Sequence, residues 1–198
     1  LEVKRVNCKI KKLFSIIIIL ACIIPTNIFA DSKHKTIVID LNKSNLSDFL
    51  EIPTLKKELE NRGYIALMNI RGDQGTGDNR AYASIGAGGR VNTYDSDFSG
   101  FKNVDKDNSV IYESATGKKS KGVNDVNINL SINDNLEKGK YGSTLGALGQ
   151  ALSDNKLSVS VLGNADIGTK PEELNRNIAA MAMDNYGRVD SGDVDNIN

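Results

Sequence analysis

Short apolar runs alternate with helix-forming segments along this chain, and this alternation is what most constrains the fold. Residues 35–41 (KTIVIDL) form one such run, typical of a buried strand, with Asp40 near its carboxyl end. The segment Pro53–Arg62 begins with a proline, which suits a first helical turn, and predicts a helix. Residues 64–71 are again strand-like. A strand, a helix and a strand at this spacing predict a parallel βαβ unit with a right-handed crossover.

The same alternation returns in the last third of the chain. Residues 143–152 place leucines on one helical face, and residues 156–163 alternate apolar and polar side chains as a strand does. Residues 169–172 resemble a capping box with proline in the first turn, and the helix they open is expected to stop at Gly187. The predicted fold class is therefore α/β, with a mixed, mostly parallel sheet between helices.

Two segments of the chain are too polar to fit this pattern. Residues 94–140 are rich in Asp, Asn, Ser and Lys, and we expect a surface excursion with short strands at 109–113 and 126–132. A flexible polar linker is the alternative, because the composition approaches that of disordered segments. Residues 190–198 are acidic and show no closing element. They are expected to be either a frayed polar tail or the beginning of the next element in a truncated reading frame.

The first 30 residues have the composition of a secretory signal. A basic start precedes the uncharged apolar run at 13–24, and a cleavage site is expected after Ala30. An uncleaved anchor is the alternative, although a membrane-spanning helix needs about 20 apolar residues. The predicted localisation is extracytoplasmic, with residues 31–198 as one α/β domain. Any membrane contact would be made by the N-terminal segment alone.

Composition excludes several classes of function for residues 31–198. Both cysteines, Cys8 and Cys22, lie in the expected signal, so disulfide scaffolds, thiolate zinc sites and cysteine nucleophiles are excluded. The whole chain has 25 basic and 25 acidic residues. With the five basic residues and one acidic residue of 1–30 set aside, 20 basic and 24 acidic residues remain. This slightly acidic balance predicts no nucleic-acid partner.

A glycine-rich loop follows the second predicted strand and leads into a short predicted helix at 79–85. Residues 72–89 contain six glycines. No GxxxxGK[ST] string occurs, and the nearest dinucleotide-like string ends in Arg80 and follows the second strand rather than the first. Both nucleotide-binding interpretations therefore fail on position and residue type. The simpler interpretation of Gly86–Gly89 is close helix packing followed by a sharp exit.

Acids at the ends of predicted strands are the main candidates for a site. Asp40 and Asp166 each follow a strand, and ligands collect at the carboxyl ends of parallel strands. Each could instead cap the turn that follows it. A hydrolase would also need a nucleophile, and Thr76 and Ser84 are the hydroxyls near the glycine loop. The sole histidine, His34, follows the expected cleavage site, which excludes an all-histidine zinc site and argues against a Ser-His-Asp triad.

Five strings in the chain, at residues 52–69, 81–90, 112–117, 145–166 and 182–187, form a recognisable series. In combination they resemble the early segment of the alkaline phosphatase-like superfamily, and in particular an exported bacterial branch of it. Together they span most of residues 35–198. Each string is weakly specific, and the resemblance rests on their combination and order.

The resemblance implies a mixed α/β sheet between helices and a divalent-metal site that hydrolyses phosphate or sulfate esters. It places Asp40 at the first metal-ligand position, although residues 41–43 depart from the family's usual Asp-Gly pattern. It places the nucleophile shortly before Ala81, where Thr76 is the only nearby hydroxyl. The remaining Asp and His ligands would lie past residue 198 or be absent. The cofactor therefore stays unknown, with Zn, Mn or Mg implied only if a full-length form is active.

Two functions follow as expectations. The first is the exported N-terminal part of an alkaline phosphatase-like hydrolase, catalytically incomplete in this chain, with a small phosphate or sulfate ester as its ligand. The second is a non-enzymatic binding or structural domain of the cell envelope, with residues 94–140 as its contact surface. The absence of a clear nucleophile favours the second function as a description of the chemistry. The fold motifs favour the first as a description of the evolutionary origin.

Overall fold

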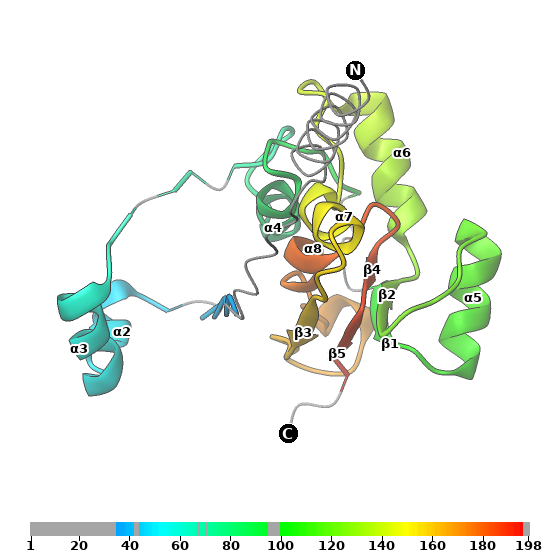
Figure 1. The fold of residues 1–198 in the computed structure, drawn as a ribbon. Helices are drawn as coiled ribbons and strands as arrows, with labels where there is room; N and C mark the ends of the chain where they lie inside the picture. The colour runs from blue at the N-terminus through cyan, green and yellow to red at the C-terminus, as the bar shows by residue number, and fades with distance from the viewer. Residues whose placement is uncertain (1–34, 42–43, 67, 70, 95–99, 196–198) are drawn as a thin grey trace, which may run out of the picture. The chain divides into compact units, whose positions relative to one another are not determined.

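The structure is a computed structural model that describes residues 35–41, 44–66, 68–69, 71–94 and 100–195. The chain divides into two units, Leu1–Ile39 and Asp40–Asn198, of which the second contains all the helices and strands described below. The expected signal segment, with Cys8, Cys22 and His34, lies outside the described residues. Helices and small sheets make the described fold a mixed α/β structure (Figure 1).

The predicted βαβ unit is present only as its helix. Helices α2 (Leu46–Leu50) and α3 (Pro53–Arg62) form, the second with Pro53 at its start as expected. The two flanking segments, as far as they are described, contain no strand. Their side chains are exposed, with Tyr64 96% accessible. A strand needs a hydrogen-bonded neighbour, and neither segment has one among the described residues, so local apolar pattern alone did not produce pairing here.

Helices α4 (Asp78–Ala87), α7 (Ala147–Asp154) and α8 (Ala179–Ala182) pack against one another and form the helical part of the core (Figure 1). The contacts are close because glycines face backbone. A Cβ atom at Gly86 would lie 2.6 Å from the carbonyl oxygen of Ala180, too near for any side chain. This confirms the close-packing interpretation of Gly86.

The larger sheet is antiparallel, which corrects the expectation of a mostly parallel sheet for this part of the fold. Its strands are β1 (Phe101–Asn103), β2 (Val123–Asp125) and β4 (Arg188–Val189), in the order β1-β2-β4. Phe101 pairs with Asp125, and Val123 pairs with Val189. Two of these strands come from the polar excursion, so that segment supplies part of the core rather than a loose surface.

The second sheet is a parallel pair, β3 (Ser160–Leu162) and β5 (Ser191–Asp193). β3 confirms the strand predicted at 156–163, although it is shorter. β5 falls in the acidic segment for which a frayed tail was one expectation, and that expectation is wrong for residues 191–195. Val194, directly after β5, is fully buried. Burial of this side chain and pairing with β3 hold the segment in the fold.

Both strands predicted in the polar excursion are helices. α5 (Lys106–Thr116) covers residues 109–113, and its ends are set by Asp105, whose side chain accepts a hydrogen bond from the Asn108 backbone, and by Gly117 in the left-handed conformation. The flexible-linker alternative is therefore also wrong for residues 100–140.

α6 (Ile128–Lys138) covers most of residues 126–132, where apolar and polar side chains alternate strictly in the sequence. The helix instead buries Ile128 and Ser131, three positions apart, and leaves Leu130 exposed. Asn135 on the same helix donates to the Ser143 carbonyl and accepts from the Asn92 amide. The helix thus places its buried and bonded residues at helical spacing, and tertiary contacts rather than the alternating pattern accompany the fold of this segment.

The helix predicted to begin at 169–172 and run to Gly187 is broken into two short pieces. A 3₁₀ turn, η2 (Pro171–Glu173), begins with Lys170 and Glu173 as its capping pair, one residue later than predicted. The chain then extends before α8. Extension lets the backbone of Asn175 bond to both Ala165 and Asp166, which a continuous helix would prevent.

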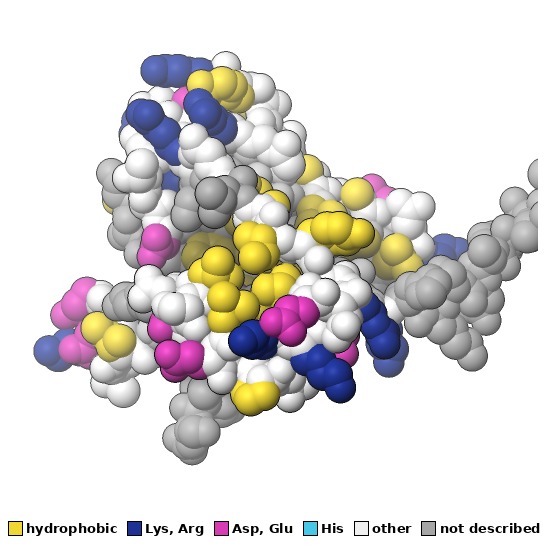
Figure 2. Space-filling view, turned by 90° about the vertical axis from the view of Figure 1, so that its left-hand side faces the viewer, with side chains coloured by type: hydrophobic (Ala, Val, Ile, Leu, Met, Phe, Trp, Pro, Cys, Tyr) yellow, Lys and Arg dark blue, Asp and Glu magenta, His cyan; other side chains and the backbone are white. Residues whose placement is uncertain are grey.

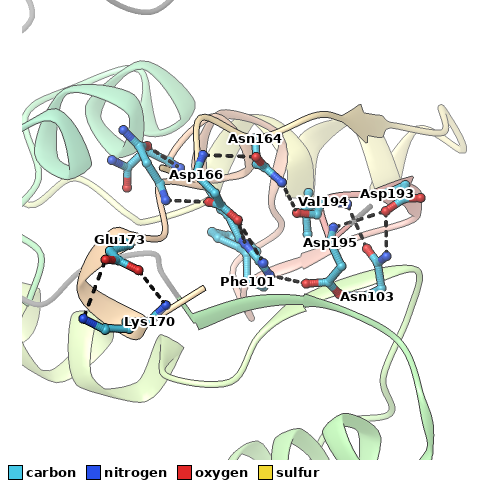
Figure 3. Close-up of polar contacts among 12 residues, drawn as sticks. Phe101, Asn103, Asn164, Asp166, Lys170, Glu173, Asp193, Val194 and Asp195 are labelled. Atoms are coloured by element: carbon cyan, nitrogen blue, oxygen red, sulfur yellow. Dashed lines mark hydrogen bonds and ion pairs between the residues drawn. The ribbon is translucent and has the colours of Figure 1, made fainter. Parts of the chain in front are cut away.

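A buried guanidinium joins the two sheets. Arg176 is 4% exposed and forms ion pairs with Asp166, at 3.1 Å, and with Asp195. It also donates to the carbonyl oxygen of Phe101 at 2.6 Å. Figure 3 shows Asp166, Asp195 and Phe101 converging from the turn after β3, the end of β5 and strand β1.

We expect Arg176→Ala to lower the free energy of unfolding by about 3 kcal/mol, because it leaves two partly buried carboxylates without their cation. Urea unfolding followed by circular dichroism measures the change. The matched control is Arg62→Ala, which removes an exposed pair with Glu58 at 3.9 Å and should cost less than about 0.5 kcal/mol. Equal small losses in the two variants would contradict this role of Arg176.

Asp190, between β4 and β5, makes stability depend on pH. Partial burial raises the pKa of Asp190, but hydrogen bonds from the Val159 amide and the Lys121 ammonium outweigh it and leave the pKa below its ordinary value of 3.8. A lowered folded-state pKa stabilises the fold above the unfolded value, and the contribution is lost as pH falls through the folded value.

We therefore expect Asp190→Asn to be less stable than the unsubstituted chain near neutral pH, by less than about 1 kcal/mol. The difference should shrink as pH falls below 3.8, where Asp190 becomes protonated in the unfolded chain and then in the folded chain. Urea unfolding over this pH range tests it, with the exposed Glu137→Gln as control. A difference that is constant with pH would contradict the assignment to Asp190.

Candidate functional site

A pocket of about 190 Å³ opens at the carboxyl end of β3. Its walls combine apolar side chains with one carboxylate and two amides. Gly163 turns the chain sharply after the strand with a φ of 104°, a conformation that favours glycine, and so forms the floor of the pocket from backbone. The lining residues are Asp40, Leu162, Gly163, Asn164, Ala165, Asn175 and Ile178.

Asp40, the predicted metal ligand, is the only acid in this lining. Its carboxylate accepts a 2.6 Å hydrogen bond from the hydroxyl of Tyr82, which lies in the second turn of α4. The structure therefore places Asp40 at the carboxyl end of a parallel strand, as the sequence predicts for a ligand-binding acid. The strand in question is β3, whereas residues 35–41, which precede and include Asp40, form no strand themselves.

Asp166 supports the pocket rather than lining it. One of its oxygens accepts from the Asn175 amide at 2.7 Å, and the other pairs with Arg176. Asn164 is similarly engaged, because its side-chain amide donates to the Val194 carbonyl at 2.7 Å and accepts from the Asp166 amide at 3.1 Å. Asp40 and Asp166 therefore do not both line the pocket, as a shared site would require. Asp40 lines it, and Asp166 stabilises the wall beside Asp40.

Thr76, the predicted nucleophile, is exposed in the glycine loop and is absent from the pocket lining. The loop is attached to the end of α6, since Asp73 accepts from the Lys140 amide at 2.6 Å and Gln74 donates to the Lys138 carbonyl at 3.0 Å. Ser84, the other hydroxyl considered, accepts from the Val91 amide at 3.2 Å and stabilises the end of α4. The structure therefore brings neither hydroxyl into the pocket.

The described residues do not fit a complete divalent-metal site. Nowhere among them do three His, Cys, Asp or Glu side chains gather to hold a metal ion. Asp40 supplies one hard oxygen ligand, and amide oxygens of the pocket are of the type that Ca²⁺ and Mg²⁺ accept. A hydrolytic zinc site needs three protein ligands. We therefore derive no catalytic step through a metal.

Tyr82 is the site residue that sequence analysis missed as a polar group. The helical pattern places it with Ala81 and Ile85 on the apolar side of the helix, and it does pack against the buried core. Its hydroxyl nevertheless reaches Asp40. Burial, then the hydrogen bond and the negative charge of Asp40, raise the pKa of Tyr82 well above its ordinary value, so the hydroxyl stays protonated as a donor.

The strings 112–117 and 182–187 lie together, away from the pocket lining. The Tyr112 hydroxyl donates to the Tyr186 carbonyl at 2.8 Å, and the Lys118 ammonium lies 4.4 Å from the centre of the Tyr186 ring. Asp184 pairs with Arg188 at 2.8 Å and closes the turn before β4. These residues bind α5 to the β2–β4 region, and their role in the described structure is in packing.

The face beside β3 carries apolar surface. In Figure 2, hydrophobic side chains gather near the centre of the face shown, with acidic and basic side chains beside them. Leu162, at the end of β3, and Ile167, in the turn that follows, are both largely exposed. The pocket therefore opens on a surface that is partly apolar rather than uniformly charged.

Comparisons with known proteins add no assignment. No protein-family model matches the chain, and neither the curated proteins nor the solved structures contain a match. Among the described residues, no helix combines the length and the apolar character needed to cross a membrane.

We expect Asn164→Ala to lower the free energy of unfolding by about 1–2 kcal/mol, because the Val194 carbonyl and the Asp166 amide both lose their partner. Urea unfolding measures it. The control is Asn155→Ala, at the end of α7, whose side chain bonds only to the exposed carbonyl of Ala151 and should matter little. If both variants unfold alike, Asn164 does not hold the pocket wall.

Proposed function

We propose that this chain is an exported protein that resembles the N-terminal part of an alkaline phosphatase-like phosphate- or sulfate-ester hydrolase, and that its described residues are catalytically incomplete. The observation that carries the proposal is the position of Asp40. Its carboxylate lines a pocket at the carboxyl end of β3 and is held by Tyr82 on α4, the helix that follows the glycine loop. The family resemblance implies a first metal ligand at that position.

The finer fold belongs to the same proposal. We infer a mostly parallel sheet between helices, of which β3 and β5 would be the parallel part in the described residues. The strand-like residues 64–66 and 68–69 are exposed and unpaired, with apolar side chains that a larger sheet would bury. The antiparallel sheet of β1, β2 and β4 would then be an addition built mainly from the polar excursion.

The small number of candidate metal ligands and nucleophiles in the pocket supports catalytic incompleteness. Asp40 is the one acid of the pocket, and Thr76 lies outside its lining. The ligand would be a small phosphate or sulfate ester, and the localisation extracytoplasmic, as the basic and apolar start of the chain predicts. Zn, Mn or Mg would be needed only by a form with further ligands, and no nucleic-acid partner is proposed.

A second candidate is a non-enzymatic binding or structural domain of the cell envelope. One observation favours it: the excursion is folded, and α5 exposes the neighbouring apolar residues Val110, 61% accessible, and Ile111, 54% accessible. Exposed apolar side chains beside each other are more typical of a contact surface than of a solvated linker. This candidate requires no ligand at Asp40.

Paramagnetic Mn²⁺ separates the two candidates. If Asp40 is a remnant metal ligand, NMR signals of the Tyr82 ring should broaden at lower Mn²⁺ concentration than those of Tyr112, which is buried elsewhere in the fold. Asp40→Asn should remove the difference, because it removes the anionic oxygen that the ion prefers. Equal broadening of both rings in the unsubstituted chain would contradict a metal-ligand role for Asp40.

The same samples test catalytic incompleteness. With added Zn²⁺, Mn²⁺ or Mg²⁺, p-nitrophenyl phosphate and p-nitrophenyl sulfate should turn over no faster than with the metal ion alone. Metal-dependent turnover that Asp40→Ala abolishes would contradict incompleteness and show that the chain carries a full site.

A further inference from the structure

Among the described residues, one side-chain hydrogen bond joins the carboxylate of Asp40 to the folded core. Asp40 is exposed, as are all the described residues around it from Lys35 to Leu41. The bond runs from the Tyr82 hydroxyl to the Oδ2 atom of Asp40. A carboxylate on exposed, extended chain would otherwise sample many orientations, so this bond decides where its charge lies.

Tyr82 is itself well placed to fix another group. It lies in α4, which packs against α7 and α8, and its ring contacts the buried core cluster. Two acids raise the pKa of the Tyr82 hydroxyl in addition to its burial: Asp40, which accepts its hydrogen bond, and Asp78, one turn earlier in the helix. Both acids favour the protonated hydroxyl, so Tyr82 remains a neutral hydrogen-bond donor.

A neutral donor has a consequence that a cation would not have. Arg or Lys beside Asp40 would orient the carboxylate but would also cancel its charge. The Tyr82 hydroxyl donates to one carboxylate oxygen of Asp40, Oδ2, at 2.6 Å, and adds no positive charge beside this pocket-lining side chain. Carboxylates that bind metals are commonly held in this way by a neighbouring donor, whose loss costs about 10- to 100-fold in affinity.

We propose that Tyr82 is the positioning residue of the candidate site, which orients Asp40 at the carboxyl end of β3 while keeping the carboxylate anionic. The consequence for ligand binding rests on the proposed function. The positioning itself does not, because it concerns two residues of this chain and can be measured without metal.

The metal-free test combines an NMR measurement on Tyr82 with a double-mutant cycle measured by urea unfolding. In a chain labelled with ¹³C at the tyrosine Cζ atom, Asp40→Asn should move the Cζ chemical shift of Tyr82 at neutral pH and leave that of Tyr141 in place, because only the Tyr82 hydroxyl donates to Asp40. Urea unfolding of Tyr82→Phe, Asp40→Asn and the double variant supplies the coupling. We expect each single substitution to lower the folding equilibrium constant several-fold, and the second substitution to add little to the first.

Tyr141→Phe is the matched control, since Tyr141 also uses its hydroxyl, as an acceptor from Arg90, but outside the pocket. Its effects should be additive with those of Asp40→Asn. Strict additivity of Tyr82→Phe with Asp40→Asn, together with a Tyr82 Cζ chemical shift that Asp40→Asn does not move, would overturn the proposal.

The Mn²⁺ experiment distinguishes the two proposals. Because Tyr82→Phe removes the Tyr82 ring signal, the signals of Ile178 in the pocket wall report Mn²⁺ binding and the Tyr186 ring is the reference. Tyr82→Phe should raise the Mn²⁺ concentration that broadens the Ile178 signals about 10-fold. Coupling without any Mn²⁺ preference would leave Tyr82 as the positioning residue and remove the metal-ligand role of Asp40. A Mn²⁺ preference that Tyr82→Phe leaves unchanged would retain that role and overturn the positioning.

Discussion

The buried guanidinium of Arg176 is the interaction on which the rest of the described structure depends. It joins β1, the turn after β3 and the end of β5, three segments that are distant in sequence. The two sheets share no strand, and this cation links them alongside the hydrogen bonds that Asn103 of β1 forms with Asp193, Val194 and Asp195. Burying a cation is costly without partners, and here two carboxylates and a carbonyl supply them.

The same network of polar contacts also holds the wall of the pocket. Asp166 is positioned by its ion pair with Arg176 and accepts a hydrogen bond from the Asn175 amide, and the turn that connects these residues to β3 forms the pocket wall. The polar groups of that wall are therefore mostly committed to the protein. Asp40 differs, because it reaches the pocket from outside the network and is held only by Tyr82 among the described residues.

Sequence patterns predicted elements well where a local signal set the ends of a helix. Pro53 marks the beginning of α3, and Gly88, left-handed with a φ of 63°, ends α4. They failed where alternation was taken for a strand: residues 126–132 alternate strictly, yet most of them lie in α6, which buries Ile128 and Ser131 three positions apart. The long helix expected after residue 169 failed for a related reason, since Asp166 needs the extended backbone at Asn175.

By itself, the sequence determined the residue supply and the local elements: no usable cysteine or histidine in residues 35–198, an acid before the first turn, a glycine corner, and the helices α3, α4 and α7. Only the tertiary structure decided which of these meet. It placed Asp40 beside β3, kept Thr76 out of the pocket lining, and assigned Asp166 to Arg176. The reason is that hydrogen bonds and ion pairs between distant segments depend on packing, which no local periodicity encodes.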